Sequence, residues 1–273
     1  MAKKDVETIE LERESITEEN PKLVIPVGRG GAGKSVVVRY LAEQAVRMGR
    51  PCVIADGDRT NATLLSFFKG LSGSTSERPE DHGITRPPSS DSIDVQDWIT
   101  GLLERMIVSR FSVFLDLGGG DQVLKEYARD LELVSFCAGQ GVDPVAIHLL
   151  GPNIDDLSYL DTVERSGVFA PEKTILALNL GKVPHGMSPV RAFDAIQSHR
   201  TFLSALERGA KAIVMPRLGC MTEIEARRLL FEDAIMSRVA AGQDPIGPVK
   251  RQLVTNWMRD MKAAFGPVSH WLP

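Results

Sequence analysis

The chain of 273 residues lacks several features that mark special classes of protein. No apolar run approaches the roughly 18 residues that a membrane-spanning helix needs, so we expect no membrane insertion. The cysteines Cys52, Cys137 and Cys220 are an odd number without a C-x-x-C pair, which argues against a zinc site and for a reducing compartment. We therefore expect a cytoplasmic protein whose cysteines are small buried hydrophobic residues.

Neither sign of charge dominates the chain, whose formal net charge is −4. Residues 1–20 contain three basic and seven acidic side chains, so this leader accounts for the whole surplus and the rest is neutral. A neutral body gives no sign of nucleic-acid binding, although a local basic patch is left open. We expect residues 1–20 to be a disordered tail or an arm, and residues 21–273 to form one domain.

Strand and helix patterns alternate from residue 22 onward. Apolar runs predict strands at 23–27, 52–55, 111–117, 145–150, 174–178 and 212–215. Helical periodicity predicts helices at 34–48, 95–106, 122–139, 153–167, 190–208 and 221–241, whereas residues 70–92, rich in Ser, Pro and Gly, predict an exposed loop. This alternation indicates an α/β fold with a mostly parallel twisted sheet, helices on both faces and a helical C-terminal part at 221–273.

The most specific motif directly follows the first predicted strand. Residues 28–35 fit G-x-x-x-x-G-K-[ST], the pattern of the phosphate-binding P-loop. Glycines let backbone N–H groups turn toward an anion, and the following helix adds the positive end of its dipole. A glycine-rich turn in another α/β fold is the alternative, but the flanking strand and helix favour the P-loop. The predicted phosphate and nucleotide contacts are Gly28, Arg29, Gly30, Gly31, Ala32, Gly33, Lys34, Ser35 and Val36.

Three acidic residues follow two of the predicted strands. Asp56 and Asp58 come after the second strand, and Asp116 lies at the end of the third, before Gly118-Gly119-Gly120. Carboxyl ends of parallel strands are where open α/β sheets bind ligands. One carboxylate there can orient a Mg²⁺-bound water and another the attacking water, and an apolar strand ending in Asp is typical of the Walker B motif. A solvated acidic turn is the alternative for the first pair, and many buried strands end in Asp.

Taken together, the RGGAGKS core, the Asp-x-Asp with Asn-Ala-Thr behind it and the LDLGGG strand end resemble the ParA/MinD family of deviant Walker A ATPases, of the SIMIBI class. The resemblance implies ATP and Mg²⁺ as ligands and an ATP-dependent homodimer. In that family, the first lysine of KGGxGK[ST] reaches the partner's phosphates across the dimer. Here Arg29 occupies the position. Arginine is always charged and can contact phosphate in bidentate fashion, but its reach and geometry differ from those of lysine. This departure leaves the dimer geometry and the hydrolysis rate open.

The resemblance also implies individual roles. Lys34 would bind phosphates, Asp58 would position the hydrolytic water, and Ser35, with Asp56 and Asp116, would hold Mg²⁺. Asn179 matches the family's base-contacting asparagine. Pro216 and Arg217 match the segment that lines the adenine.

Within the family, the chain looks most similar to plasmid conjugal-transfer and stability ATPases of the TraL type. The shared features are the Asn-Ala-Thr sequence, a long helix after the last strand and a C-terminal helix at 251–265.

That C-terminal helix carries an apolar stripe. Leu253, Trp257, Met261 and Phe265 recur every four residues, with basic residues nearby. MinD-like members bind membranes through such a tail, and a basic helix with Trp suits an interface. Packing against the domain explains the same stripe, and we favour it because single amphipathic helices usually face a core.

We therefore predict a slow, Mg-ATP-dependent, dimerising ATPase that acts as a nucleotide switch for positioning, partitioning or transfer of plasmid DNA or protein cargo. An adaptor or cargo protein is the implied partner, and DNA binding is left open. Two alternatives belong to other classes: a small-molecule kinase or ligase, which would need a second substrate pocket, and a nucleotide-gated scaffold with negligible hydrolysis.

Overall fold

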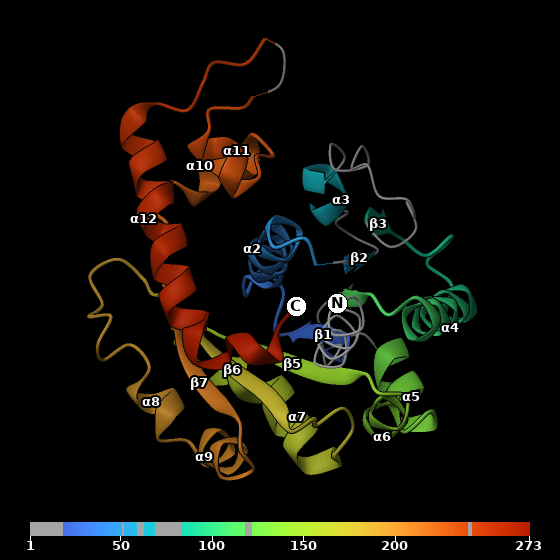
Figure 1. The fold of residues 1–273 in the computed structure, drawn as a ribbon. Helices are drawn as coiled ribbons and strands as arrows, with labels where there is room; N and C mark the ends of the chain where they lie inside the picture. The colour runs from blue at the N-terminus through green and yellow to red at the C-terminus, as the bar shows by residue number, and fades with distance from the viewer. Residues whose placement is uncertain (1–18, 51, 59–62, 69–82, 118–121, 240–241) are drawn as a thin grey trace, which may run out of the picture.

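The computed structural model describes residues 19–50, 52–58, 63–68, 83–117, 122–239 and 242–273. A seven-stranded sheet runs through them in the order β3-β2-β4-β1-β5-β6-β7, and every neighbouring pair is parallel (Figure 1). The strands are β1 (Lys22–Val27), β2 (Cys52–Gly57), β3 (Gly83–Thr85), β4 (Ser112–Leu117), β5 (Asp143–Leu150), β6 (Lys173–Asn179) and β7 (Lys211–Met215). The predicted α/β fold with a parallel sheet is thus confirmed.

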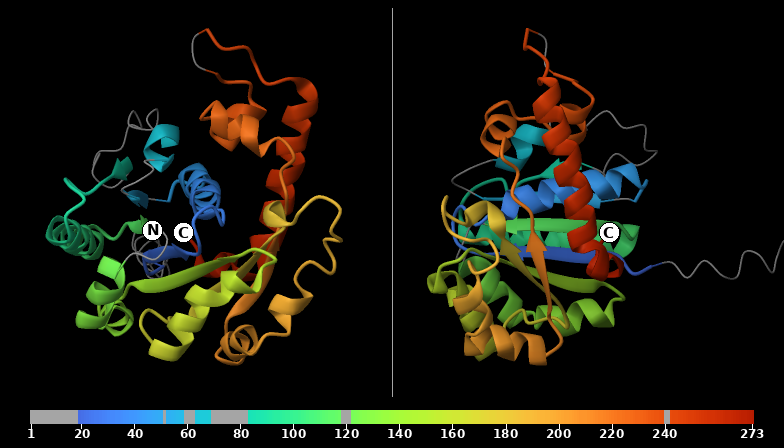
Figure 2. Two further views of the ribbon diagram at one scale, coloured as in Figure 1. Left: turned by 180° about the vertical axis from the view of Figure 1, so that it is seen from behind. Right: turned by 90° about the vertical axis from the view of Figure 1, so that its left-hand side faces the viewer.

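Helices cover both faces of the sheet (Figures 1 and 2). The α-helices are α2 (Lys34–Arg47), α3 (Thr63–Phe68), α4 (Ser92–Ser109), α5 (Gln122–Asp130), α6 (Leu133–Gly139), α7 (Ser158–Ser166), α8 (Asp194–Gln197), α9 (Arg200–Glu207), α10 (Met221–Ala226), α11 (Phe231–Ile235) and α12 (Pro248–Phe265), with 3₁₀ turns η3 (Ile154–Leu157), η4 (Leu180–Lys182) and η5 (Gly266–Trp271). One face packs against α2, α11 and α12, and the other against α4 to α9.

The strand order places β1 at the centre of the sheet. The chain builds β2, β3 and β4 on one side of β1, and then β5, β6 and β7 on the other. In open α/β sheets, ligands bind beyond the carboxyl ends of the strands where the order reverses. The loop after β1 lies at this point.

Several predicted helices are shorter than their periodicity indicated. The predicted helix at 122–139 is divided where Glu132 adopts a left-handed φ of 49° between α5 and α6. The predicted helix at 190–208 is divided at Ser198 and His199, which separate α8 from α9. The single long helix predicted at 221–241 is also wrong: Arg228 has a φ of 51° between α10 and α11, so one feature of the TraL-type resemblance is missing.

The predicted loop at 70–92 is also partly wrong. Within the described residues, Gly83–Thr85 pairs with β2 as a parallel edge strand, and α4 begins at Ser92. Residues 70–82 of that predicted loop, residues 1–18, Asn61 and Gly118–Gly120 lie outside the described residues.

The C-terminal helix α12 packs on the domain, as favoured above. Val254, Trp257, Met261 and Phe265 are buried, whereas Leu253 is exposed, contrary to the predicted stripe. The Trp257 indole Nε1 donates a hydrogen bond to the Pro216 carbonyl at 2.9 Å. No helix in the described part of the chain is long and apolar enough to cross a membrane.

All three cysteines are buried and free, which confirms their prediction as small hydrophobic residues.

Candidate functional site

The loop between β1 and α2 has the backbone geometry that its glycines were expected to allow. Gly31 and Gly33 adopt left-handed φ angles of 76° and 108°, a region open to glycine without strain. The Ala32 N–H donates to the Arg29 carbonyl at 3.0 Å and closes the turn. A Cβ on Gly33 would lie 2.7 Å from Asn179 Nδ2, so this position excludes any side chain.

Two side chains of the octet have defined partners. Lys34 Nζ donates to the Gly28 carbonyl at 3.2 Å, so the ammonium group curls over its own loop. Ser35 Oγ donates to Asp116 Oδ2 at 3.1 Å. The structure therefore brings the predicted Ser35 and Asp116 together, although 81 residues separate them in sequence.

The two strand-end acids lie next to each other. Asp56 and Asp116 are register partners on the adjacent strands β2 and β4, and both are buried. Burial raises the pKa of Asp116 to about 6, against the opposing effects of Lys34 and the Ser35 hydrogen bond. Burial also raises the pKa of Asp56, whose Oδ2 accepts a hydrogen bond from the Leu65 N–H at 3.0 Å.

Asp56, Asp116 and Ser35 could bind a magnesium ion that has few protein ligands. Asp116 Oδ1 is buried and has no hydrogen-bond partner, which leaves one lone-pair-bearing oxygen available beside the Ser35 hydroxyl. Among the described residues, no group of three or more His, Cys, Asp and Glu side chains could hold a metal by itself. Mg²⁺ is commonly bound by one or two carboxylates together with substrate phosphates and water, and these residues supply ligands of that kind.

Asp58 is partly buried at the end of β2 and is joined to a residue that the sequence analysis missed. The guanidinium of Arg86 donates from Nη2 to the Asp58 carbonyl at 3.0 Å and from Nε to the Asp56 carbonyl at 3.4 Å. Arg86 follows the edge strand β3, within the segment predicted to be a loop. No motif marked it, because its partners are backbone atoms 28 and 30 residues away.

The three residues predicted to contact the base lie together at a pocket of about 390 Å³. Asn179, Pro216 and Arg217 line it, and Gly33 and Val36 join it to the phosphate loop. Arg217 Nε donates to the Leu180 carbonyl at 3.1 Å and its Nη2 donates to the Val183 carbonyl, which holds the 180–183 segment against the end of β7.

Asn179 is engaged with the protein itself. Its Nδ2 donates to the Ala32 carbonyl at 2.8 Å, its Oδ1 accepts from the Gly181 N–H at 2.8 Å, and the residue is 2% exposed. The side chain thus ties the end of β6 to the phosphate loop. Its role as a base contact stays a prediction, and its shown contacts are those of a positioning residue.

Arg29 also has intramolecular partners that the sequence did not indicate. Its Nη1 lies 3.8 Å from Asp155 Oδ2 and 3.8 Å from Asp156 Oδ1, both in η3 after β5. The Arg29 side chain is 47% exposed, so these contacts are loose and solvent-screened.

The site combines the buried central strand β1, a glycine loop with two left-handed glycines, and the helix α2 that follows it. At the start of α2, Ser35 is hydrogen-bonded to Asp116 near the end of the neighbouring strand β4. The chain has a P-loop NTPase fold.

No protein-family model and no curated protein matches the chain by sequence. Solved structures match it in three dimensions. The MinD cell division protein of Aquifex aeolicus is 10% identical, with a TM-score of 0.46 over 88% of this chain and 97% of that one. The septum site-determining protein MinD of Pyrococcus horikoshii, complexed with Mg-ADP, is 16% identical, with a TM-score of 0.47 over 86% and 95%.

The signal recognition particle receptor FtsY of Elizabethkingia anophelis, in complex with GDP, is 16% identical, with a TM-score of 0.42. The match covers 71% of this chain and 56% of that receptor, so the chain spans little more than half of its length. At 10 to 16% identity, these matches concern the fold alone.

Proposed function

We propose that the chain is a Mg-ATP-dependent ATPase that acts as a nucleotide switch. The observation that carries the proposal is the Ser35–Asp116 hydrogen bond beneath the glycine loop, with Asp116 Oδ1 left unpaired. Such a pair supplies a hydroxyl and a carboxylate at the place where a P-loop holds its metal. When bound, Mg²⁺ supplies neutralisation of charge on the phosphates.

The remaining residues have roles that follow from their positions. Lys34 holds the outer phosphates once its ammonium group leaves the Gly28 carbonyl. Asp58 orients the attacking water from the end of β2. The pocket at Asn179, Pro216 and Arg217 takes the base, because Gly33 and Val36 join it to the phosphate loop.

The proposal extends to assembly and cargo. Arg29 contacts the phosphates bound by a second copy of the chain, so that ATP drives formation of a homodimer. Its ion pairs with Asp155 and Asp156 are long, at 3.8 Å, and the Arg29 side chain is about half exposed, so they cost little to break, about 0–1 kcal/mol. In the cytoplasm, an adaptor or cargo protein binds the ATP-bound dimer, and the cargo is plasmid DNA or a protein. This part of the proposal is based on the motif resemblance.

Nucleotide binding is tested by titrating the full chain with a fluorescent ATP analogue and Mg²⁺. Lys34→Ala should weaken binding at least tenfold, about 1.4 kcal/mol, because a charge-assisted phosphate contact is lost. Lys262→Ala, on the exposed side of α12, is the matched control and should bind normally. Equal affinity of the two variants would contradict the proposal.

Steady-state ATP hydrolysis, with and without DNA, distinguishes a switch from a scaffold with negligible turnover. Phosphate release that needs only water and Mg²⁺ supports the ATPase, and its absence favours the scaffold.

A small-molecule kinase or ligase remains the second candidate, because a separate pocket lies beside Gly28 and Lys34. ATP loss that depends strictly on an added small molecule would favour it.

A further inference from the structure

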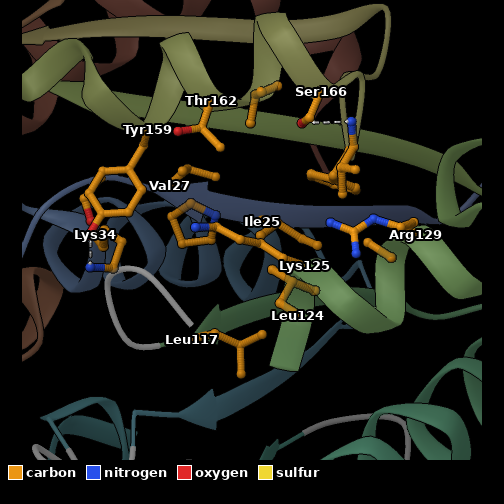
Figure 3. Close-up of a pocket in the computed structure, with 16 residues that line it drawn as sticks. Ile25, Val27, Lys34, Leu117, Leu124, Lys125, Arg129, Tyr159, Thr162 and Ser166 are labelled. Atoms are coloured by element: carbon orange, nitrogen blue, oxygen red, sulfur yellow. Dashed lines mark hydrogen bonds between the residues drawn. The ribbon is translucent and has the colours of Figure 1, made fainter. Parts of the chain in front are cut away.

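A second pocket lies beside the phosphate loop, on the opposite side of the sheet from α2. Its volume is about 130 Å³, and its walls come from β1, α5, α7 and the segment after α7 (Figure 3). Ile25, Leu124 and Phe169 make the walls largely apolar, and Gly28 and Lys34 form its end at the loop. This pocket is separate from the one at Asn179 and Pro216, with which it shares no lining residue.

The charge of the pocket is of one sign. Lys125 and Arg129, four residues apart on α5, line it together with Lys34, and none of its described lining residues is acidic. Within the described part of the chain, neither Lys125 nor Arg129 forms an ion pair. Lys125 Nζ lies 5.9 Å from the centre of the Tyr159 ring, and its side chain extends across the pocket in Figure 3. Lys125 is partly buried against the apolar walls, where a cation without a carboxylate partner attracts an anion more strongly than in open water, and the exposed Arg129 adds positive charge at the same side.

Polar groups on α7 complete the lining. Tyr159, Thr162 and Ser166 lie on one face of the helix and are drawn along the same side of the pocket in Figure 3. Ser166 Oγ accepts a hydrogen bond from the Val168 N–H at 3.2 Å, and Thr162 Oγ1 donates to the Ser158 carbonyl at 2.9 Å. Apolar walls with a small number of convergent polar groups are typical of small-molecule sites.

We propose that this pocket binds a small organic anion, a carboxylate carried on a compact apolar body. A dry cavity of about 150 Å³ accommodates benzene, so the apolar part of the ligand is limited to about one aromatic ring or a branched chain of that size. The apolar walls take this body, and Lys125 and Arg129 take the carboxylate at the α5 side. A bare inorganic anion would leave the apolar walls without a partner.

The site is tested on the full chain without nucleotide, so that its failure is separable from failure of the ATPase proposal. The probes are 4-fluorobenzoate and its neutral counterpart 4-fluorobenzamide, followed by fluorine NMR. Benzoate should bind saturably and at least tenfold more tightly than the amide. Lys125→Met with Arg129→Met should reduce benzoate affinity at least tenfold, since methionine retains an apolar stem but no charge. Lys262→Met, exposed on α12, should leave it unchanged.

A pocket-filling variant assigns the probe to this place in the fold. Thr162 is exposed at the rim, so Thr162→Phe should plug the pocket and abolish benzoate binding while the protein stays folded by circular dichroism. Absence of saturable binding, or equal binding of acid and amide, overturns the proposal. Binding that survives Thr162→Phe and is displaced by pyrophosphate belongs to the phosphate loop and overturns it as well. If Thr162→Phe does not fold, the double methionine variant decides alone.

Discussion

At the scale of single residues, the glycines of the phosphate loop are not equivalent. Gly33 has a φ of 108° and its missing Cβ leaves room for the Asn179 amide, whereas a Cβ on Gly30 would meet nothing within 4 Å. Asn179 cannot move aside freely because both of its polar atoms are hydrogen-bonded. The same residue type therefore has a strict requirement at one position and a permissive one three residues earlier.

We therefore expect alanine at these two positions to affect the stability of the protein differently. Gly33→Ala should lower the free energy of unfolding by about 1–3 kcal/mol and impair nucleotide binding, because a left-handed alanine is strained and crowds Asn179. Gly30→Ala should fold with stability close to that of the wild type. Urea unfolding of both variants is the measurement, and equal stabilities would contradict the geometry of the loop.

Asp116 should also make the stability of the nucleotide-free protein depend on pH. Burial raises its pKa to about 6, above the unfolded value of about 4. Between about pH 4 and 6 the native state holds more of this proton than the unfolded state, so its contribution to stability falls as pH rises. The loss reaches about 2–3 kcal/mol above pH 6.

Asp116→Asn should remove this contribution, so that at pH 7.5 the variant is more stable than the wild type while its Mg²⁺-dependent nucleotide binding is weaker. Urea unfolding of wild type and variant at matched pH values isolates Asp116 from other titrating groups. Parallel pH profiles for the two proteins would refute the prediction. Mg²⁺ binding has the opposite pH dependence, because it needs the ionised carboxylate and should strengthen as pH rises through 6.

At the scale of elements, α2 is joined to the C-terminal helices by a buried ionic residue. Glu43, on α2, accepts hydrogen bonds from the N–H groups of Phe231 and Glu232 at 2.9 and 3.0 Å, so its carboxylate caps the start of α11. Burial raises the pKa of Glu43 to about 7. One turn earlier, Arg39 lies between the rings of Phe67 and Phe231, at 4.2 and 4.0 Å.

We expect Glu43→Ala to destabilise the protein by about 2–4 kcal/mol, because two N–H groups at the start of α11 lose their acceptor. The control is Glu207→Ala, a change of the same residue type at an exposed position at the end of α9, which should alter stability by less than about 0.5 kcal/mol. Denaturant unfolding followed by circular dichroism measures both. A small effect at Glu43 would indicate that α11 is held by its apolar contacts alone.

At the scale of the whole molecule, the proposed switch depends on a second copy of the chain. Light scattering after size exclusion should show a dimer for Asp58→Ala with ATP and Mg²⁺, because hydrolysis is blocked while the phosphates stay bound. Adding Arg29→Ala should return that protein to a monomer. Adding Arg259→Ala, an exposed arginine of α12, should not. Equal dimerisation of the Arg29 and Arg259 double variants would remove the role of Arg29 across the dimer.

The sequence by itself determined six of the sheet's seven strands, all but the edge strand β3, and the position of its glycine loop. Continuous apolar strands such as Leu23–Val27 have few alternatives to a buried parallel sheet, and the octet with its flanking strand and helix is a local pattern that needs no distant contact. Residues at the carboxyl ends of such strands, Asp116 in β4 among them, must gather at one edge of the sheet, so the proximity of Asp116 to Ser35 could be predicted.

Only the tertiary structure decided which groups face each other across long sequence separations. The Arg29 contacts with η3, the Asn179 bond under the loop and the Glu43 cap on α11 each join segments more than 120 residues apart. The divisions at Glu132 and Arg228 were likewise hidden, because a left-handed non-glycine residue has no reliable local signature. Local propensity and periodicity define elements, whereas the packing of those elements chooses partners for their polar side chains.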